Sequence, residues 1–336
     1  MSRAADERPV RATVTARAAG SDAEEATRIL RGELGAPHPV PLPQLRELSP
    51  GTEPLARTVT HLEGLHVGLT PQGFRLTAAR VGDSAEVRRL RAAHASLLSL
   101  TADVLAGAPA GPTVVGVVGP ATLAAALALP SGEPVLSDPG ALRDVMQSWV
   151  AGMSGLAGRT AASLPGARPV LDVREPELDA VLAGTVRSSS GFRRLRAPDR
   201  ADIAGAWEGL AALAECWLPL HPLLAPSRAA AALRVAAPGS DPGAWEGIAG
   251  LVEAGRDIVL EVPPARAGER VSARAASLAE PWRRLGLPAA SLGALVVDDR
   301  PGSPLSPDEL RTAAISSRDL AEALDVVRHD DLGALL

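Results

Sequence analysis

Residues 113–120, TVVGVVGP, and residues 169–176, PVLDVREP, are two apolar runs that each end at a turn containing proline. Both runs are rich in valine and have the length of a buried strand. Between them, residues 139–162 place apolar side chains at the 3.6-residue spacing of a helix face. Strand, helix and strand in this order form a unit that joins parallel strands. This stretch therefore predicts an α/β fold with a parallel sheet.

The same alternation continues in both directions along the chain. Further apolar runs typical of strands lie at Arg11–Ala16, His66–Thr70, Trp217–His221, Leu233–Ala236, Ile258–Val262 and Ala294–Asp298. Helical patterns that separate most of them lie at Ala23–Leu34, Ser84–Leu105, Ala201–Glu215, Pro242–Ala254 and Ser272–Arg284. Eight strands alternating with helices favour a closed (β/α)8 TIM barrel over an open doubly wound sheet. We expect residues 1–336 to form one barrel domain, with a flexible N-terminus over residues 1–8.

Proline and glycine mark the places where this regular pattern is interrupted. Clusters at residues 35–43 and 262–268 predict long loops. Asp138 precedes Pro139, and Ser306 precedes Pro307, which puts a capping side chain directly before a proline at the first helical position. These signals predict where two of the longer helices begin.

Composition limits the partners of this chain. Hydrophobic residues make up 46% of it, but no apolar stretch approaches the roughly 20 residues of a bilayer span. The charged N-terminus lacks the apolar core of a secretory signal. A net charge of −5, two Phe and no Tyr argue against a nucleic-acid surface. We therefore expect a soluble cytoplasmic protein without a membrane or nucleic-acid partner.

Composition also limits the chemistry. The single cysteine, Cys216, excludes an intrachain disulfide and a zinc site built from several cysteines. All basic residues other than histidine are arginines, so neither a Schiff-base lysine nor a phosphate-binding P-loop lysine is present. The remaining candidates are acids, histidines, arginines and hydroxyl groups.

If the barrel is correct, function belongs at the C-terminal ends of the strands. Glu175 follows one strand, and it is a candidate general acid or base, or a group that holds a cationic part of a ligand. The adjacent Arg174 offers an equally good alternative, a local ion pair in solvent. His221 ends another apolar run, where imidazole could bind a metal or carry a proton. The more common role of such a histidine is structural, with its ring satisfied by a backbone carbonyl.

Four other segments carry weaker signals. Residues 188–194, SSSGFRR, combine hydroxyls, a glycine and two arginines, which suits a phosphate or a carboxylate. Residues 298–300, DDR, could bind a divalent cation, although a solvated turn is the more common structure for two adjacent acids. His61 and His66 do not have the spacing of a zinc-binding helix, so we expect structural roles for both. His329 lies near the C-terminus, where a solvated tail is the default.

The order of several segments is also that of a known family. Residues 117–133 read VVGPATLAAALALPSGE, and LSDPGALRD, REPELDAVLAG and SSSGFRRLR follow at residues 136–144, 174–184 and 188–196. In this order they resemble short actinobacterial proteins related to cobalamin-independent methionine synthase. The similarity is to the C-terminal catalytic barrel of that enzyme, and it runs from about Ala12 to the final helix.

The resemblance implies a (β/α)8 barrel of the type shared by methionine synthase and uroporphyrinogen decarboxylase. In that family, a methyl group passes from methyltetrahydrofolate to the thiol of homocysteine, which zinc binds and activates as a thiolate. The resemblance places Arg174 and Glu175 in the substrate-binding corner, and we expect Ser190 and Arg193 of the SSSGFRR segment to bind substrate as well. It places His221 at the histidine of the family's His-x-Cys zinc-binding pair.

The chain departs from the family at its zinc site and at its substrate corner. Leu223 occupies the place of the cysteine in the pair, Ala236 or Ala237 that of the acidic ligand, and no cysteine follows the last strand. The Asp of the family's D-E-P motif is Arg174 here, which would repel a substrate ammonium group. With His221 as the sole remnant of the ligand set, we expect no cofactor, although the parental family uses zinc.

These observations leave more than one function open. The first is methyl transfer of the methionine synthase type. The alternative is a non-catalytic or repurposed barrel whose mouth binds a small anionic molecule or a protein partner, which the missing ligands and the arginines at 174, 193 and 194 favour. A third, less favoured possibility is a zinc-free enzyme similar to uroporphyrinogen decarboxylase.

Overall fold

The strand order of the main sheet identifies the fold. The computed structural model describes residues 8–15, 17–18, 22–45, 53–239, 241–266, 268–299 and 305–330. The strands of the main sheet are β1 (Arg11–Val14), β3 (Val40–Pro41), β7 (Gly111–Val118), β8 (Ala167–Arg174), β9 (Cys216–Pro219), β10 (Ala232–Ala236), β11 (Asp257–Val262) and β12 (Leu295–Asp299). Their order is β1-β12-β11-β10-β9-β8-β7-β3, so each strand adjoins its neighbour in chain order.

Two further observations show that this sheet is of the barrel type. The pairs β1–β12, β12–β11, β11–β10, β9–β8 and β7–β3 are parallel. The first strand, β1, contacts β3 as well as β12. A doubly wound sheet reverses its strand order at a switch point, whereas a sequential order that returns to the first strand is that of a barrel. The predicted (β/α)8 fold class is confirmed.

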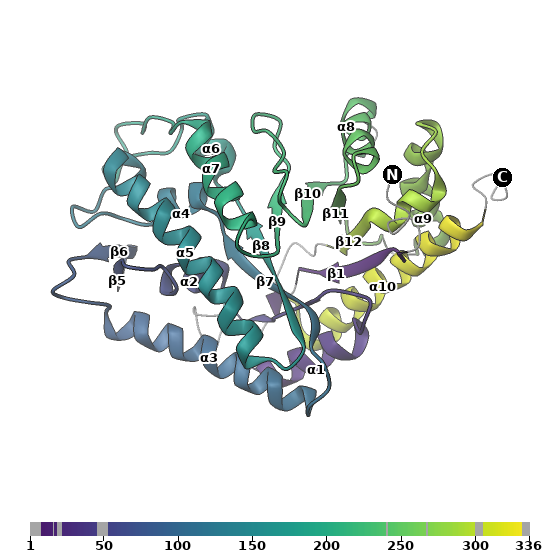
Figure 1. The fold of residues 1–336 in the computed structure, drawn as a ribbon, viewed down its shortest axis with the longest axis horizontal. Helices are drawn as coiled ribbons and strands as arrows, with labels where there is room; N and C mark the ends of the chain where they lie inside the picture. The colour runs from purple at the N-terminus through teal and green to yellow at the C-terminus, as the bar shows by residue number, and fades with distance from the viewer. Residues whose placement is uncertain are drawn as a thin grey trace. The chain divides into compact units, whose positions relative to one another are not determined.

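Helices connect the strands (Figure 1). They are α1 (Ala23–Glu33), α2 (Pro54–Thr60), α3 (Ala85–Leu105), α4 (Pro120–Ala126), α5 (Pro139–Ser163), α6 (Leu178–Leu182), α7 (Arg200–Ala211), α8 (Pro242–Glu253), α9 (Val271–Arg284) and α10 (Pro307–His329), with short 3₁₀ helices η2 (Val135–Ser137) and η3 (Ala289–Ala294). Short strands outside the main sheet are β2 (Arg17–Ala18), β4 (Gln44–Leu45), β5 (His66–Thr70) and β6 (Gly73–Thr77). None of the helices in the described ranges is both long and apolar enough to cross a bilayer.

The helix starts follow the predicted capping signals. The Asp138 carboxylate accepts hydrogen bonds from the backbone amides of Gly140 and Ala141 at the start of α5. At the start of α10, Ser306 and Glu309 form a reciprocal capping box. Each arrangement satisfies backbone N–H groups that have no partner within the helix.

One predicted strand does not belong to the barrel. Residues 66–70 form β5, which pairs antiparallel with β6 in a separate hairpin. The second barrel strand is instead β3, only two residues long, which lies inside the proline-rich segment predicted to be a loop. Because β3 contains Pro41 and has no room for a periodic pattern, the sequence gives no strand signal there.

The described chain divides into two compact units. The first comprises residues 1–43, 111–114 and 231–336, and the second comprises residues 44–110 and 115–230. In the first, α10 packs against α1, α9 and β1. In the second, α5 runs along β8 and α7 (Figure 1). Buried Trp149 of α5 donates its indole N–H to Val118 O on β7 at 2.8 Å. The boundaries predicted for a single domain remain a prediction.

Candidate functional site

Glu175, the first residue after β8, turns towards the N-terminus of α4. Its carboxylate accepts hydrogen bonds from the backbone amides of Ala121, at 3.1 Å, and Thr122, at 2.7 Å. A Cβ atom at Gly119 would lie 2.2 Å from Glu175 Oε1, so only glycine leaves room for this carboxylate. Desolvation raises the pKa of Glu175 to about 7, although the hydrogen bonds from Thr122 and Ala121 favour its charged form. The residue predicted to bind substrate therefore has a local partner in α4.

Arg174 forms an ion pair with Asp172, two residues earlier on the same strand. Arg174 Nε lies 2.6 Å from Asp172 Oδ2, and both side chains are largely buried. Alternate residues of a strand point to the same side, which is why these two meet. The solvated ion pair with the adjacent Glu175 that the sequence left open does not form, because Arg174 pairs with the buried Asp172 and Glu175 contacts α4.

His221 lies two residues beyond β9 and uses both ring nitrogens in hydrogen bonds. Leu223 N donates to Nδ1 at 3.2 Å, so the ring proton is on Nε2, which lies 2.9 Å from Asp179 Oδ1. Neither nitrogen presents a lone pair to a metal in this arrangement. His221 therefore links the segment that follows β9 to α6.

The donor set does not fit the zinc ion that the resemblance implies. Among the described residues, no group of three or more His, Cys, Asp or Glu side chains is placed to hold a metal. Cys216 is buried in β9, and desolvation raises the pKa of its thiol to about 12, whereas zinc binds thiolate. These residues supply no zinc-bound thiolate chemistry.

The serine-rich loop between α6 and α7 forms a tight turn anchored to a neighbouring segment. Arg187 and Arg194 form an antiparallel bridge, and Ser190 Oγ lies 3.1 Å from Ser188 Oγ. Ser189 donates through its backbone N–H and its hydroxyl to the Glu133 carboxylate, at 3.0 and 2.7 Å. These bonds, and more weakly the charge of Arg193, lower the pKa of Glu133. The hydroxyls predicted to bind an anion thus make contacts within the protein.

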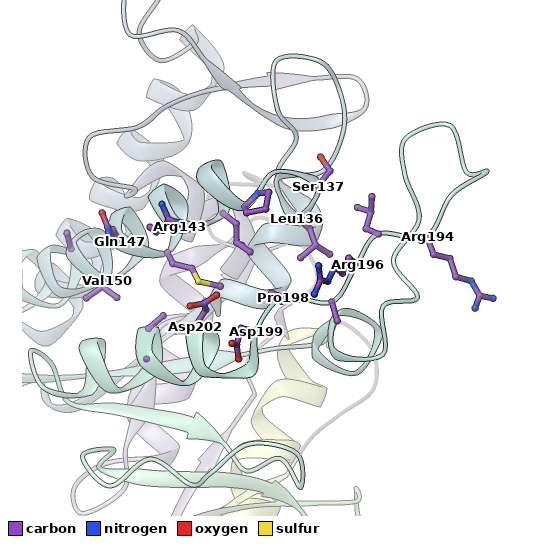
Figure 2. A pocket seen from close by; sticks show the side chains of 18 of the residues that line it. Leu136, Ser137, Arg143, Gln147, Val150, Arg194, Arg196, Pro198, Asp199 and Asp202 are labelled. Carbon is purple, nitrogen blue, oxygen red and sulfur yellow. The ribbon is translucent and has the colours of Figure 1, made fainter.

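Beside this loop lies a pocket of 1090 Å³ between α5, α7 and residues 193–199 (Figure 2). Its apolar wall includes Leu142 and Met146 of α5, one turn apart, and Leu136 of η2. Val150 continues the same helix face, and Leu213, just past α7, remains 62% exposed. A cavity of this size and apolar character is typical of a small-molecule site.

Four arginines line this pocket, which are Arg143, Arg193, Arg194 and Arg196. All four are exposed, and within the described ranges their guanidinium groups have no ion pair or hydrogen bond. In Figure 2 Arg194 points away from the cavity, while Arg143 and Arg196 stand on separate elements at its edge. Two acids also line it, and one of them, Asp199, accepts a hydrogen bond from Ala201 N as the cap of α7. The pocket therefore combines an apolar wall with an excess of positive charge.

The first unit holds a buried charge network that sequence reasoning did not find. Arg234 of β10 contacts Asp298 Oδ2 of β12 at 2.5 Å and Glu261 Oε1 of β11 at 3.1 Å. Thr15, just past β1, donates its hydroxyl to Asp298 Oδ2 at 2.9 Å. In the parallel register Glu261 lies opposite Asp298, so the two acids share a face. One arginine thus bridges carboxylates on two neighbouring strands.

Asp298 and Asp299 do not form the solvated turn that was expected to be more common for two adjacent acids. Asp298 is fully buried and Asp299 is 3% exposed. Asp299 contacts Arg274 of α9 at 3.3 Å and accepts a hydrogen bond from Ser316 of α10 at 3.0 Å, while desolvation raises its pKa. Consecutive strand residues point to opposite faces, so the two acids serve different partners. Arg300 lies outside the described residues.

Two histidines are buried where α2 and α3 meet. His61 Nδ1 lies 2.8 Å from Arg57 O, and its ring meets that of His94 edge-on, with centroids 5.1 Å apart. His94 is 1% exposed, and neither of its ring nitrogens has a hydrogen-bond partner in the part of the chain that is described. Desolvation lowers the pKa of His61 to about 4 and that of His94 to about 2. Both rings are neutral at physiological pH.

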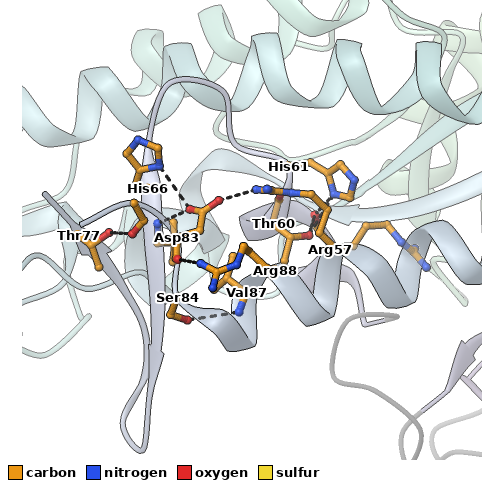
Figure 3. Close-up of polar contacts among 12 residues, drawn as sticks. Arg57, Thr60, His61, His66, Thr77, Asp83, Ser84, Val87 and Arg88 are labelled. Carbon is orange, nitrogen blue, oxygen red and sulfur yellow. Dashed lines mark hydrogen bonds and ion pairs between the residues drawn. The ribbon is translucent and has the colours of Figure 1, made fainter. Parts of the chain in front are cut away.

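His66 and His329 also have local partners. The Asp83 carboxylate accepts a hydrogen bond from Val67 N at 3.0 Å, and its Oδ1 lies 3.6 Å from His66 Nδ1 (Figure 3). His329 is the last residue of α10, and its Nδ1 lies 2.7 Å from Asp325 O. These contacts agree with the structural role expected for His66 and place His329 on a helix end instead of a tail.

Comparisons with known proteins identify no family. No model of a protein family matches the chain, and no curated protein sequence matches it. Among solved structures it is similar to the GH5-4 broad specificity endoglucanase from an uncultured bacterium, with 11% identity and a TM-score of 0.41, over 97% of this chain and 95% of that chain. At this identity and TM-score the likeness carries no argument about activity, and the fold assignment rests on strand order and register.

Proposed function

We propose that this barrel binds a small anionic molecule in the pocket between α5 and α7, and that it does not catalyse zinc-dependent methyl transfer. The observation that carries the proposal is the arginine set of that pocket. Among the described residues, Arg143 and Arg196 line the cavity without an ion pair to a carboxylate, and such guanidinium groups favour an anion, which they bind through charge-assisted hydrogen bonds. Arg143 and Arg196 are the two we expect to contact it, because both border the cavity and Arg194 points away.

The local charge supports an anion more strongly than the composition of the chain does. The protein as a whole carries a net charge of −5, whereas arginines outnumber acids around this pocket. Positive charge concentrated at a cavity in an otherwise acidic protein raises the local concentration of anions. The loop between α6 and α7 lines part of this pocket, and the sequence analysis had selected Arg193 of that loop.

Methyl transfer of the methionine synthase type has less support from the residues present. His221 donates and accepts within the protein, Cys216 is a buried thiol, and Arg174 is paired with Asp172. Two of the four segments that resemble the family, residues 136–144 and 188–196, contribute to the pocket, so common descent and a changed ligand are compatible. Binding in the absence of zinc would separate the two functions.

Calorimetric titration of the full chain with inorganic phosphate and with succinate at low ionic strength tests the proposal. We expect millimolar or tighter binding that weakens as salt is added, because salt screens exposed charges. Arg143→Gln and Arg196→Gln should each weaken binding about tenfold, a loss of about 1.4 kcal/mol. Arg284→Gln is the matched control, because Arg284 is exposed and does not line the pocket.

Two results would overturn the proposal. One is the absence of anion binding to the wild-type protein, or equal binding by the pocket and control variants. The other is stoichiometric zinc in the purified protein together with methylation of homocysteine, which would favour the parental activity instead.

A further inference from the structure

We infer that the ligand of the α5–α7 pocket is an amphipathic anion, with one anionic head group joined to a flexible apolar chain. This inference rests on the proposed function and adds the substrate class to it. It comes from the way in which the pocket's charged and apolar residues are distributed along α5.

The apolar residues form a continuous stripe on one helix. Leu142, Met146 and Val150 are spaced four residues apart, so they lie on one face of α5. All three line the pocket, and Leu142 and Met146 are themselves buried. A ligand that follows this stripe contacts hydrocarbon along its whole length, and a compact anion such as phosphate would leave the stripe uncovered.

The α7 wall of the pocket holds two small residues one turn after Asp202. Gly205 and Ala206 of α7 line it, and they leave space that larger side chains would fill. Further along, the helices come together, because a Cβ atom at Gly209 would lie 3.6 Å from the methyl carbons of Val150. A Cβ atom at Gly205 would meet no atom within 4 Å, so there is more space beside Gly205 than beside Gly209, and this space suits an unbranched chain.

The charged residues of the pocket lie near the start of the two helices, where Asp202 is in the first turn of α7 and Asp199 caps that helix. Arg143 lies in the second turn of α5, and Arg196 lies in the loop that leads to α7. Val150 is two turns beyond Arg143, about 10 Å along the helix axis. A head group held by the two arginines would thus place its chain over the apolar stripe, with its end near Val150 and the exposed Leu213.

The exposure of Leu213 supports an apolar ligand. Its side chain is 62% exposed at the edge of the pocket. A leucine that adjoins an apolar groove extends the hydrocarbon surface open to water, and such surfaces mark binding sites more often than isolated exposed leucines do. A bound chain would cover Leu213 and the groove together.

Calorimetric titration with a series of anions tests the inference on the full chain. The probes are hexanoate, octanoate and decanoate below their micellar concentrations, with inorganic phosphate and decyl phosphate as a second pair. We expect Kd to fall about twofold to fourfold for each added methylene, since each buried CH₂ favours binding. Decyl phosphate should bind at least a hundredfold more tightly than inorganic phosphate.

Variants separate the two parts of the ligand. Leu213→Ser should weaken decanoate binding at least threefold and leave inorganic phosphate unaffected, whereas Arg143→Gln should weaken both. Val81→Ser is the control, because Val81 is 68% exposed and does not line the pocket. Leu213 and Val81 are exposed, so neither substitution should impair folding, and circular dichroism confirms this.

The possible outcomes distinguish the inference from the function on which it rests. If phosphate and short carboxylates bind but chain length has no effect, the inference is wrong and the proposed function stands. If decanol binds as tightly as decanoate, the anionic head is not recognised and the inference is wrong. If no anion of any length binds, the proposed function fails and the inference fails with it.

Discussion

Acidification should destabilise this protein through two buried histidines, His61 and His94. In the unfolded chain both rings take up a proton below about pH 6.5, whereas burial lowers their folded pKa values to about 4 and about 2. The unfolded state therefore binds more protons than the folded state, and the free energy of unfolding falls as pH decreases from 6.5 towards 4. By linkage, each histidine accounts for a loss of about 2 kcal/mol between pH 8 and pH 5.

Glu175 acts in the opposite direction over part of the same range. Its pKa is raised to about 7 from an ordinary value of 4.5, so its folded form binds a proton more readily than its unfolded form. The free energy of unfolding consequently rises as pH decreases from 7 towards 4.5, by about 2 kcal/mol between pH 7 and pH 5. The free energy of unfolding of the wild-type protein varies with pH as the sum of these opposing contributions, and a histidine variant is needed to isolate one of them.

His94→Leu provides that isolation. His94 has no hydrogen-bond partner for either ring nitrogen within the described residues, so the leucine removes a buried unsatisfied group. It should raise the free energy of unfolding by about 1–2 kcal/mol at pH 8. At pH 5 the increase in the free energy of unfolding should be larger by about a further 2 kcal/mol, because leucine, unlike histidine, has no proton to release when the chain folds.

Urea denaturation at pH 8, 7, 6 and 5, monitored by tryptophan fluorescence, gives these free energies by linear extrapolation. His66→Gln serves as the control, because the His66 side chain is 40% exposed. Its profile should follow that of the wild type. A His94→Leu profile that runs parallel to the wild-type profile from pH 8 to pH 5 would refute a buried, neutral His94.

Three other predictions concern residues that lie in the strands or shortly after them. Gly119→Ala should lower the free energy of unfolding by about 2–4 kcal/mol, because its methyl group would overlap the Glu175 carboxylate. In urea denaturation, the double variant Gly119→Ala/Glu175→Ala should recover at least half of the free energy that Gly119→Ala loses. Arg234→Met should lower the free energy of unfolding by about 3–5 kcal/mol in urea denaturation, because it removes the cation between two buried acids. Adding Asp298→Leu should restore part of that free energy. A loss under about 1 kcal/mol for Arg234→Met would contradict this prediction. Elemental analysis should find less than one tenth of an equivalent of zinc in the wild-type protein dialysed against a chelator, and the same in the His221→Gln variant. A full equivalent of zinc in the undialysed protein would contradict the assignment of His221.

The sequence predicts most of the barrel because each long strand and helix carries its own local signal. Apolar runs predicted β7, β8, β10, β11 and β12 to within about two residues at each end. The exception, β3, is held by its parallel partner β7 and by Leu42 N, which donates to Val114 O. A strand of two residues depends on tertiary pairing alone, so no window of sequence can reveal it.

The candidate site was only partly accessible from sequence, since its residues meet through packing. Arg193 was predicted because hydroxyls and arginines lie together in one loop. Arg143 lies some 50 residues earlier on an ordinary helix face, and only the packing of α5 against α7 places it at the same pocket. The partner of Glu175 was hidden for a similar reason, because it belongs to the strand–helix unit before its own.

The corner formed by Asp172, Arg174 and Glu175 has no carboxylate free to bind a substrate ammonium group. A substrate ammonium group needs an unneutralised carboxylate, yet Asp172 has Arg174 at 2.6 Å and the carboxylate of Glu175 is bound by the amides of α4. Both acids of the corner therefore already have internal partners, and breaking either interaction would leave a buried charge without a partner. An anion at Arg143 and Arg196 requires no such rearrangement, because exposed guanidinium groups remain solvated until the ligand arrives. Binding of an amino-acid substrate at this corner would therefore require substitution of Arg174 and release of Glu175 together, and neither change alone would suffice.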